Sequence, residues 1–333
     1  MNITFLVGNG FDLNLGLPTR FSDFIRYYNS KDHNDIIAKE MKENYEYWSD
    51  LEVALGQFVG KIEEDQVKAF IESKVLLERG LADYWHKVKN DYELKITEQG
   101  INEFKRQVVD FYTEFNKIYR EEINDVIKRT KESIHYQFIT FNYTDYLDTI
   151  ITEASNSGVF GTHSAGTTFQ DYVLPPLHVH GSVLSDMVLG VNDKTQMSGK
   201  ATVKSRLSEF MLKPRLNDTL GEQRTNDAKN MIFGSHYVCV YGMSFGITDL
   251  MWWKKIYEWL NQSKFHRLII YTRMNIADLP SATAKTQKLI QIKRRFLQFV
   301  EKEEESSVAN KIIVVPHARL FTFKNIKAIP KAE

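Results

Sequence analysis

Four apolar runs of this chain contain, or lead into, polar and glycine-rich segments whose residue types suit nucleotide chemistry. These segments are Gly8-Asn9-Gly10-Phe11-Asp12, Asn142-Tyr143-Thr144, His178-Val179-His180-Gly181-Ser182, and Gly242-Met243-Ser244 continuing to Asp249. The runs themselves lack polar alternation and are typical of buried strands. Because ligands of open parallel sheets bind beyond the carboxyl ends of the strands, we expect the four segments to form one site.

The first of these segments places glycines where the backbone must turn tightly after a strand. Glycine lets a backbone approach a phosphate with no Cβ in the way. The N–H groups of Gly8, Asn9 and Gly10 are therefore candidate ligands of a pyrophosphate. The third glycine of the dinucleotide fingerprint is absent, since Leu13 stands there. An ordinary strand-to-helix turn remains an alternative interpretation.

The elements that must position these segments are predicted by six apolar runs. They are Ile3–Val7, Tyr136–Phe141, Leu177–Leu184, Tyr237–Tyr241, Leu268–Tyr271 and Ile312–Val315. Parallel strands that are covered on both faces have continuous apolar sequences of this kind. Helical patterns lie between several of the runs, so the sequence predicts an α/β fold with a doubly wound, mostly parallel sheet.

The segment between the first two predicted strands is too long for one crossover connection, and its sequence is almost entirely typical of helices. We expect a discontinuous sheet domain at residues 1–30 and 134–330, with an all-helical insertion at residues 31–133. Within the insertion, Ser49 and Glu52 could form a capping box. An apolar stripe at helical spacing comprises Phe104, Val108, Phe111, Phe115 and Ile118. The stripe predicts either a helical hairpin packed within the chain or a contact between two copies in a homo-oligomer.

Two other stretches are predicted to be loops. Residues 155–176 are rich in Gly, Ser and Thr and end in two prolines, and residues 190–230 are polar and mixed. Loops of this length are often lids or binding loops. Since residues 155–176 separate the runs that carry Asn142 and His180, we expect them to cover the site.

Composition limits the class of protein. The chain has 333 residues, with 43 basic and 43 acidic side chains and a formal net charge of zero, which makes nucleic acid an unlikely partner. No stretch is as long and apolar as a membrane helix, so no membrane association is expected. The single cysteine, Cys239, excludes an intramolecular disulfide and a cysteine-rich zinc site, and we expect a cytoplasmic protein.

The order and spacing of the motifs resemble a known fold family. Gly8-x-Gly10, Gly16-Leu17-Pro18-x-Arg20, Thr140-x-Asn142, His180-Gly181-Ser182 and Gly242-x-Ser244 resemble the sirtuin-type NAD-binding domain. The strings GNGFD, GLPT, FNYT and HVHGS are similar to the abortive-infection AbiH family of bacterial anti-phage proteins, a sirtuin-like branch of that fold. The resemblance covers residues 1–30 and about 134–325 and implies a Rossmann-like sheet.

The resemblance implies that NAD is hydrolysed to nicotinamide and ADP-ribose in phage defence. Sirtuins that deacylate lysine carry a four-cysteine zinc module, so the single cysteine makes both zinc and deacylation unexpected here. Breaking the nicotinamide–ribose bond requires stabilisation of an oxocarbenium-like centre and an oriented water. His180 is the candidate general base, and Asn142 could place the water or hold ribose hydroxyls.

The remaining candidate residues would bind the rest of NAD. Phe11 would wall the pocket, and Arg20 could pair with a phosphate or close the site. Ser244 and Asp249 are candidates for the adenosine end, where a carboxylate suits ribose hydroxyls. The other motif residues assigned to the binding site are Asp12, Pro18, Gly181, Ser182 and Gly242.

Several alternatives stay open. The chain could bind NAD or ADP-ribose as a signal and activate a partner without catalysis. His178 and His180 could hold a metal in a nuclease, but no acidic partner is close in sequence and no metal is expected. Asp12 and Asp145 could be helix caps, and His163 a bystander in a loop. A constantly active NAD hydrolase would kill its host, so we expect a phage-derived trigger, whose identity the sequence does not contain.

Overall fold

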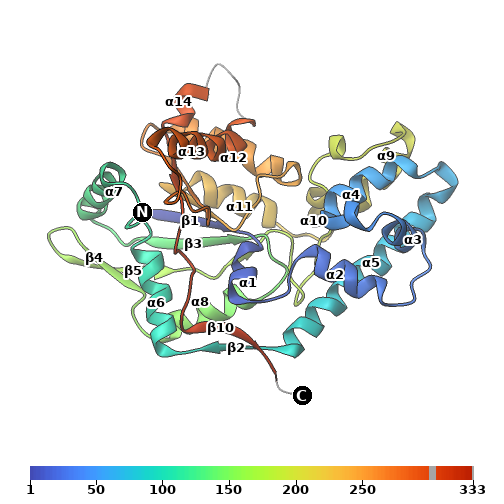
Figure 1. The fold of residues 1–333 in the computed structure, drawn as a ribbon, viewed down its shortest axis with the longest axis horizontal. Helices are drawn as coiled ribbons and strands as arrows, with labels where there is room; N and C mark the ends of the chain where they lie inside the picture. Colours follow the sequence, from blue (N-terminus) through green and yellow to red (C-terminus); the bar gives the residue numbers. More distant parts are fainter. Residues whose placement is uncertain (300–304, 332–333) are drawn as a thin grey trace.

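The computed structural model describes residues 1–299 and 305–331 of the chain. Its centre is a mostly parallel sheet in the order β4-β5-β3-β1-β7-β8-β9, with the short strand β6 beside β3 (Figure 1). The strands are β1 (Asn2–Val7), β3 (His135–Thr140), β4 (Gly161–Ser164), β5 (Thr168–Val173), β6 (Leu177–His178), β7 (Tyr237–Tyr241), β8 (Arg267–Tyr271) and β9 (Ile312–Val315). The predicted α/β class and mostly parallel sheet are therefore confirmed.

The order of the parallel strands creates a switch point between β1 and β7. Numbered along the chain, β1, β3, β5, β7, β8 and β9 lie in the spatial order 3-2-1-4-5-6. Val7 at the end of β1 pairs with Thr140 of β3 on one side and with Tyr241 of β7 on the other. The connections leave these central strands in opposite directions, which opens a crevice beyond their carboxyl ends.

Helices cover both faces of the sheet, which explains why its central strands are mostly apolar. The core on one face includes residues of α6 (Glu98–Val109), α7 (Lys117–Arg129) and α8 (Tyr146–Asn156). The core on the other face includes residues of α11 (Arg224–Phe233), α12 (Leu250–Gln262), α13 (Ala282–Leu297) and α14 (Glu305–Ala309). Within β1, Phe5 stacks on Phe138 in the first core, and Leu6 lies in the second.

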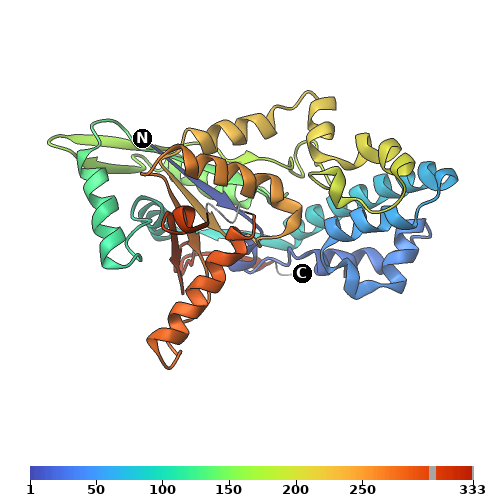
Figure 2. The same cartoon turned by 90° about the horizontal axis from the view of Figure 1, so that it is seen from above.

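A group of helices that we call the helical lobe lies beyond the carboxyl ends of β1 and β3, on the right in Figures 1 and 2. It consists of α2 (Phe21–Asn29), α3 (Ile36–Glu43), α4 (Leu51–Phe58), α5 (Val67–Asp91), α9 (Ala201–Met211) and α10 (Lys213–Thr219). The short helix α1 (Gly10–Leu15) leads into it from β1. Two distant parts of the sequence thus build one lobe.

The segment predicted as an all-helical insertion, residues 31–133, also contains a strand. β2 (Tyr92–Ile96) pairs antiparallel with β10 (Ile326–Pro330), and α6 packs on the central sheet. Most of the apolar stripe packs within the chain, because Phe104, Val108, Phe111 and Phe115 are buried. Ile118, by contrast, is 75% exposed.

The prediction that residues 155–176 cover the site as a lid is wrong. Most of residues 155–176 belong to the hairpin β4–β5, residues 161–173, in which Gly161 pairs with Asp171 and Ser164 with Thr168. Tyr172 and Val173 of the hairpin pair with His135 and Tyr136, at the amino end of β3. The hairpin therefore lies at the end of the strand opposite to Asn142.

Two further predictions about local structure need correction. Residues 190–230, predicted as a loop, contain α9, α10 and most of α11. Val203, Leu207 and Met211 are buried at a spacing of four residues, which is helical. Of the predicted strand Leu177–Leu184, only Leu177 and His178 are in a strand, and His180 lies in the turn that follows.

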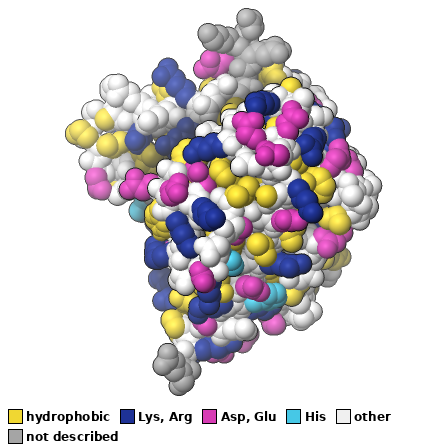
Figure 3. Space-filling view, turned by 90° about the vertical axis from the view of Figure 1, so that its right-hand side faces the viewer, with side chains coloured by type: hydrophobic (Ala, Val, Ile, Leu, Met, Phe, Trp, Pro, Cys, Tyr) yellow, Lys and Arg dark blue, Asp and Glu magenta, His cyan; other side chains and the backbone are white. Residues whose placement is uncertain are grey.

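The surface of the helical lobe carries both signs of charge. Figure 3 views that end of the molecule and shows Lys and Arg interspersed with Asp and Glu. This distribution agrees with the formal net charge of zero. Within residues 1–299 and 305–331, no helix combines the length and the apolar character that crossing a membrane requires.

Candidate functional site

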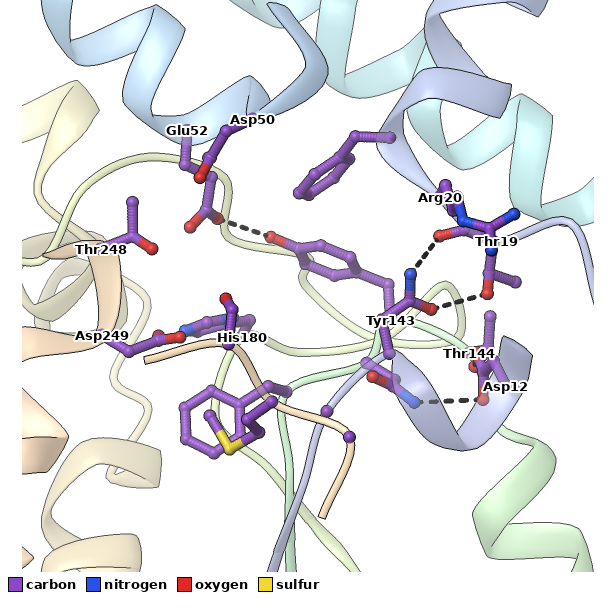
Figure 4. Close-up of a pocket in the computed structure, with 18 of the residues that line it drawn as sticks. Asp12, Thr19, Arg20, Asp50, Glu52, Tyr143, Thr144, His180, Thr248 and Asp249 are labelled. Atoms are coloured by element: carbon purple, nitrogen blue, oxygen red, sulfur yellow. Dashed lines mark hydrogen bonds between the residues drawn. The ribbon is translucent and has the colours of Figure 1, made fainter. Parts of the chain in front are cut away.

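A cavity of about 460 Å³ lies at the switch point, between the ends of β1, β3 and β7 and the helical lobe (Figure 4). Its volume is typical of small-molecule sites. The sequence-predicted residues that line it are Gly8, Asn9, Asp12, Arg20, Asn142, His180, Gly242, Ser244 and Asp249. The structure thus brings the four motif segments together around one space, and the helical lobe supplies the opposite wall.

At one end of the cavity, Asp12 holds the side chains that follow β3. Its Oδ1 accepts a hydrogen bond from Asn142 Nδ2 at 3.1 Å, and its Oδ2 accepts one from Thr144 Oγ1 at 2.5 Å. Burial raises the pKa of Asp12 to about 7, although the two hydrogen bonds act in the opposite direction. Asp12 is therefore neither a helix cap nor a freely exposed ligand: it positions Asn142 and Thr144.

Asn142 keeps one polar atom without a partner. Its Nδ2 is used by Asp12, but its buried Oδ1 has no hydrogen-bond partner among the described residues. The side chain lines the cavity. Buried acceptors are nearly always satisfied, so this oxygen is suited to a donor on a ligand or a water.

Asn9 and Thr19 join the first two motifs. Asn9 Nδ2 donates to the carbonyl oxygen of Thr19 at 2.7 Å, and Thr19 Oγ1 donates to Asn9 Oδ1 at 2.6 Å. Both side chains line the cavity, and the adjoining Arg20 is exposed. The guanidinium of Arg20 is thus accessible to an anionic group.

The glycines after β1 have a different role from the predicted one. The N–H groups of Gly8 and Gly10 donate to the carbonyl oxygens of Tyr241 and Gly242, both at 2.9 Å, so neither is a free phosphate ligand. A Cβ on Gly10 would lie 2.4 Å from the Cα of Gly242. Glycine is required here because the two loops at the switch point touch through their backbones.

Five of the predicted binding residues do not line the cavity: Gly10, Phe11, Pro18, Gly181 and Ser182. Phe11 packs edge-on against Phe321 in the core, so it is not a pocket wall. The carbonyl oxygen of Pro18 accepts a hydrogen bond from the Tyr84 hydroxyl at 2.7 Å.

The other two of these residues shape the turn that holds His180. Gly181 has a φ of +68°, and a Cβ there would lie 1.9 Å from the carbonyl oxygen of Asp186. The hydroxyl of Ser182 accepts a hydrogen bond from the Leu184 N–H at 3.2 Å. Gly181 and Ser182 therefore support the site without forming its surface.

The opposite end of the cavity contains a buried ionic cluster around His180. Lys213 Nζ lies 2.5 Å from Glu52 Oε1, and it lies 3.2 Å from His180 Nε2 and 3.5 Å from Nδ1. The Tyr143 hydroxyl donates to Glu52 Oε1 at 3.3 Å and to the carbonyl oxygen of Val188 at 3.1 Å. Figure 4 shows Asp249 and Thr248 beside this cluster.

The cluster perturbs the protonation of its members. Burial, together with the positive charge of Lys213, holds the pKa of His180 well below its usual range. Burial raises the pKa of Asp249 to about 7 and raises that of Glu52, while Lys213 opposes both shifts. His180 is therefore a neutral imidazole at physiological pH.

The first histidine of the HVHGS motif, His178, contacts a carboxylate and a backbone carbonyl oxygen. His178 Nε2 lies 2.8 Å from Asp148 Oδ2, and its Nδ1 lies 3.1 Å from the carbonyl oxygen of Asn142. The ring of His163 likewise has both nitrogens in contact, Nδ1 with the Asp171 carboxylate and Nε2 with the Thr130 carbonyl oxygen. In the part of the chain that the structure describes, no three His, Cys, Asp or Glu side chains form a metal-binding group.

Glu52 and Lys213 belong to the site but were not predicted from the sequence, and Tyr143 was predicted only as part of the Asn142-Tyr143-Thr144 segment. Glu52 was expected in a capping box with Ser49, but Asp50 caps α4 by accepting the Val53 N–H, and Glu52 points to Lys213. Lys213 lay within a predicted loop. No local pattern pairs these two residues, because their contact exists only when α4 and α10 pack together.

The comparisons with known proteins agree with the motifs. The family model described as Bacteriophage abortive infection AbiH matches residues 4–271, which include every residue that lines the cavity. A search of curated proteins finds no match. Because the family model matches most of the sequence, the chain belongs to the bacteriophage abortive infection AbiH family.

Proposed function

We propose that this AbiH-family protein binds NAD in the switch-point cavity and hydrolyses the bond between nicotinamide and ribose. Membership of the family indicates a role in abortive infection. Loss of NAD would stop the metabolism of an infected cell and so block phage growth. The substrate and the reaction are our inference from the site.

The position of the cavity supports a dinucleotide as the ligand. The strand order 3-2-1-4-5-6 is that of many dinucleotide-binding sheets, in which the ligand lies at the switch point. The cavity lies at this point, and the motifs around it resemble those of sirtuin-type domains. Arg20 at the rim could contact the pyrophosphate. The N–H groups of Gly8 and Gly10 donate to the carbonyl oxygens of Tyr241 and Gly242, so we assign the phosphates no contact with these two amides.

The observation that carries the proposal is the unpartnered Oδ1 of Asn142. Asp12 fixes the orientation of the amide by accepting from Nδ2, which leaves Oδ1 as an acceptor at the cavity. A ribose hydroxyl or the attacking water could donate to this oxygen. Either contact would orient the reacting sugar.

The acidic lining suits the charge that develops during cleavage. In the reaction, a water oxygen bonds to the anomeric carbon as its bond to nitrogen breaks. The electron pair stays on the nitrogen, and the attacking water loses one proton to bulk solvent, which leaves a hydroxyl group on the anomeric carbon of ADP-ribose. Because the nicotinamide ring begins as a cation and leaves neutral, positive charge moves to the ribose. Glu52 and, in its ionised form, Asp249 lie at the His180 end and could stabilise that charge.

One observation favours a second candidate function, the binding of NAD or ADP-ribose as a signal. His180 has a pKa well below its usual range and lies against an ammonium group, so it is a weak proton acceptor. A site that only binds nucleotide has no need of a strong base. Nicotinamide release separates the two functions.

The experiment incubates NAD with protein purified from phage-challenged cells and measures free nicotinamide by chromatography. We expect release by the wild type and a loss of about 10²-fold or more in Asn142→Ala and in His180→Ala. Asn29→Ala is the matched control, because Asn29 also has a buried Oδ1 without a described partner but does not line the cavity. Binding of NAD without release would support the signalling function. A wild type that neither binds nor cleaves NAD would contradict both.

A further inference from the structure

The helical lobe contains a buried ion pair, Glu52–Lys213, whose lysine contacts His180 in the turn after β6. Glu52 lies on α4 and Lys213 begins α10, and both side chains are buried. Their partner His180 follows β6, where its ring lies edge-on to Phe141. Buried ion pairs often contribute little net stability, because removing the charges from water is costly. The contact of Lys213 with His180 indicates that this ion pair acts on the protonation of the histidine ring.

Lysine restricts which ring nitrogen of His180 can carry a proton. A protonated lysine only donates hydrogen bonds, so the imidazole nitrogen that it contacts must be an unprotonated acceptor. Lys213 Nζ is closer to Nε2, at 3.2 Å, than to Nδ1, at 3.5 Å. The proton of the neutral ring is then on Nδ1.

We propose that Lys213, held in place by Glu52, is a positioning residue that fixes His180 as the neutral Nδ1–H tautomer. In the hydrolysis proposed above, on which this role rests, His180 then donates a hydrogen bond to a ribose hydroxyl or a water. It does not abstract a proton while Lys213 is in contact. A neutral histidine that acts as a donor is a known solution in enzyme sites.

The other charged groups at this end of the cavity do not cancel the effect of Lys213. Glu52 is paired with Lys213, and the Tyr143 hydroxyl also donates to Glu52. Asp249 and Asp50 line the same end, and burial favours the protonated form of Asp249. Behind Gly181, Arg224 adds a second positive charge and is itself paired with Glu222. Among these charged groups, Lys213 is the one that shifts the pKa of His180, which it lowers.

The test is NMR of the histidine side chains, with ¹⁵N and ¹³C labels, over a pH titration without NAD. His180→Gln identifies the signals of His180. We expect wild-type His180 to stay neutral through neutral pH, with Nε2 unprotonated and Nδ1 protonated. In Lys213→Met, the titration midpoint should rise by at least about one pH unit, because the like charge has gone.

Three further variants keep the test decisive. Lys213→Arg retains the positive charge and should keep the low titration midpoint of His180. The double variant Lys213→Met/Glu52→Gln removes both charges of the ion pair, so neither is left unpaired. It should also raise the midpoint, although less than the single variant. Lys105→Met is the control, since Lys105 is a buried lysine that donates to the carbonyl oxygen of Val159, away from the cavity.

Two results would overturn the proposal. One is a wild-type His180 that titrates at an ordinary histidine midpoint or carries its proton on Nε2. The other is a midpoint that is the same in wild type, Lys213→Met and the double variant. Both are measured without substrate, so they are distinct from a failure to release nicotinamide, which would contradict the hydrolysis alone.

Discussion

Replacing Asp12 by Asn should make the protein more stable at neutral pH, even though it removes a residue that holds Asn142. Asp12 is 1% exposed, and both carboxylate oxygens accept hydrogen bonds from neutral donors. An asparagine there can still accept from Asn142 Nδ2 through its oxygen. Its amide can donate to the Thr144 hydroxyl, which can turn to accept. The variant therefore resembles the protonated form of Asp12.

The size of the effect follows from the pKa of Asp12. Burial raises this pKa from 3.8 to about 7, so the native protein keeps a proton that the unfolded chain has released over this interval. Stability is then lost as pH rises from about 4 to about 7, by about 1.4 kcal/mol for each pH unit. Above pH 7 the ionised wild type should be less stable than Asp12→Asn by about 4 kcal/mol.

The measurement is the free energy of unfolding in urea, for wild type and Asp12→Asn, at a series of pH values from about 4 to about 8. We expect the difference between the two proteins to grow with pH and to level off above about pH 7. Asp125→Asn, the same change at an exposed position on α7, serves as the control for replacing a buried carboxyl group. A difference between wild type and Asp12→Asn that does not change with pH would refute the assignment of a protonated, buried Asp12.

Two other predictions concern the architecture around the site. Gly10→Ala should lower the free energy of unfolding by roughly 1–3 kcal/mol, because its Cβ would meet the Gly242 backbone. Gly246→Ala, whose Cβ would make only ordinary contacts, is the control in the same thermal or urea unfolding assay, and equal losses would contradict the explanation. Proteolysis within the β4–β5 hairpin, residues 161–173, should proceed at the same rate with and without NAD, since the hairpin lies at the amino end of β3. Protection of the hairpin by NAD, measured by gel electrophoresis or mass spectrometry, would restore its predicted role as a lid.

The sequence alone was sufficient for the strands that build the site. β1, β3, β7, β8 and β9 are mostly apolar because helices cover both faces of the sheet, so each run is identifiable without knowing its neighbours. The residues that follow three of these strands could then be placed at one sheet edge. Asn142 and Gly242 reach the cavity because chain direction in a parallel sheet fixes where strand ends lie.

Local patterns were insufficient where an element is short or lies at an edge. The hairpin of residues 161–173 has a glycine, Gly166, with a φ of +85° in its turn, but its strands are polar and half-exposed. Their Gly, Ser and Thr content is that of a loop, and only pairing with His135 and Tyr136 of β3 makes them part of the sheet. The helix α9 was not predicted because its buried residues, Val203, Leu207 and Met211, lie among many polar ones.

What the sequence by itself determined is which residues stand at the ends of the strands, because backbone periodicity and burial act over a few neighbouring residues. What only the tertiary structure decided is how those residues are used. The backbone N–H groups of Gly8 and Gly10 donate to Tyr241 and Gly242, and the side-chain amide of Asn142 is oriented by Asp12. The state of His180 depends on Lys213, which a helix far away in the sequence supplies. Such contacts involve groups that no local pattern relates, since packing of the lobe against the sheet brings them within a few ångströms.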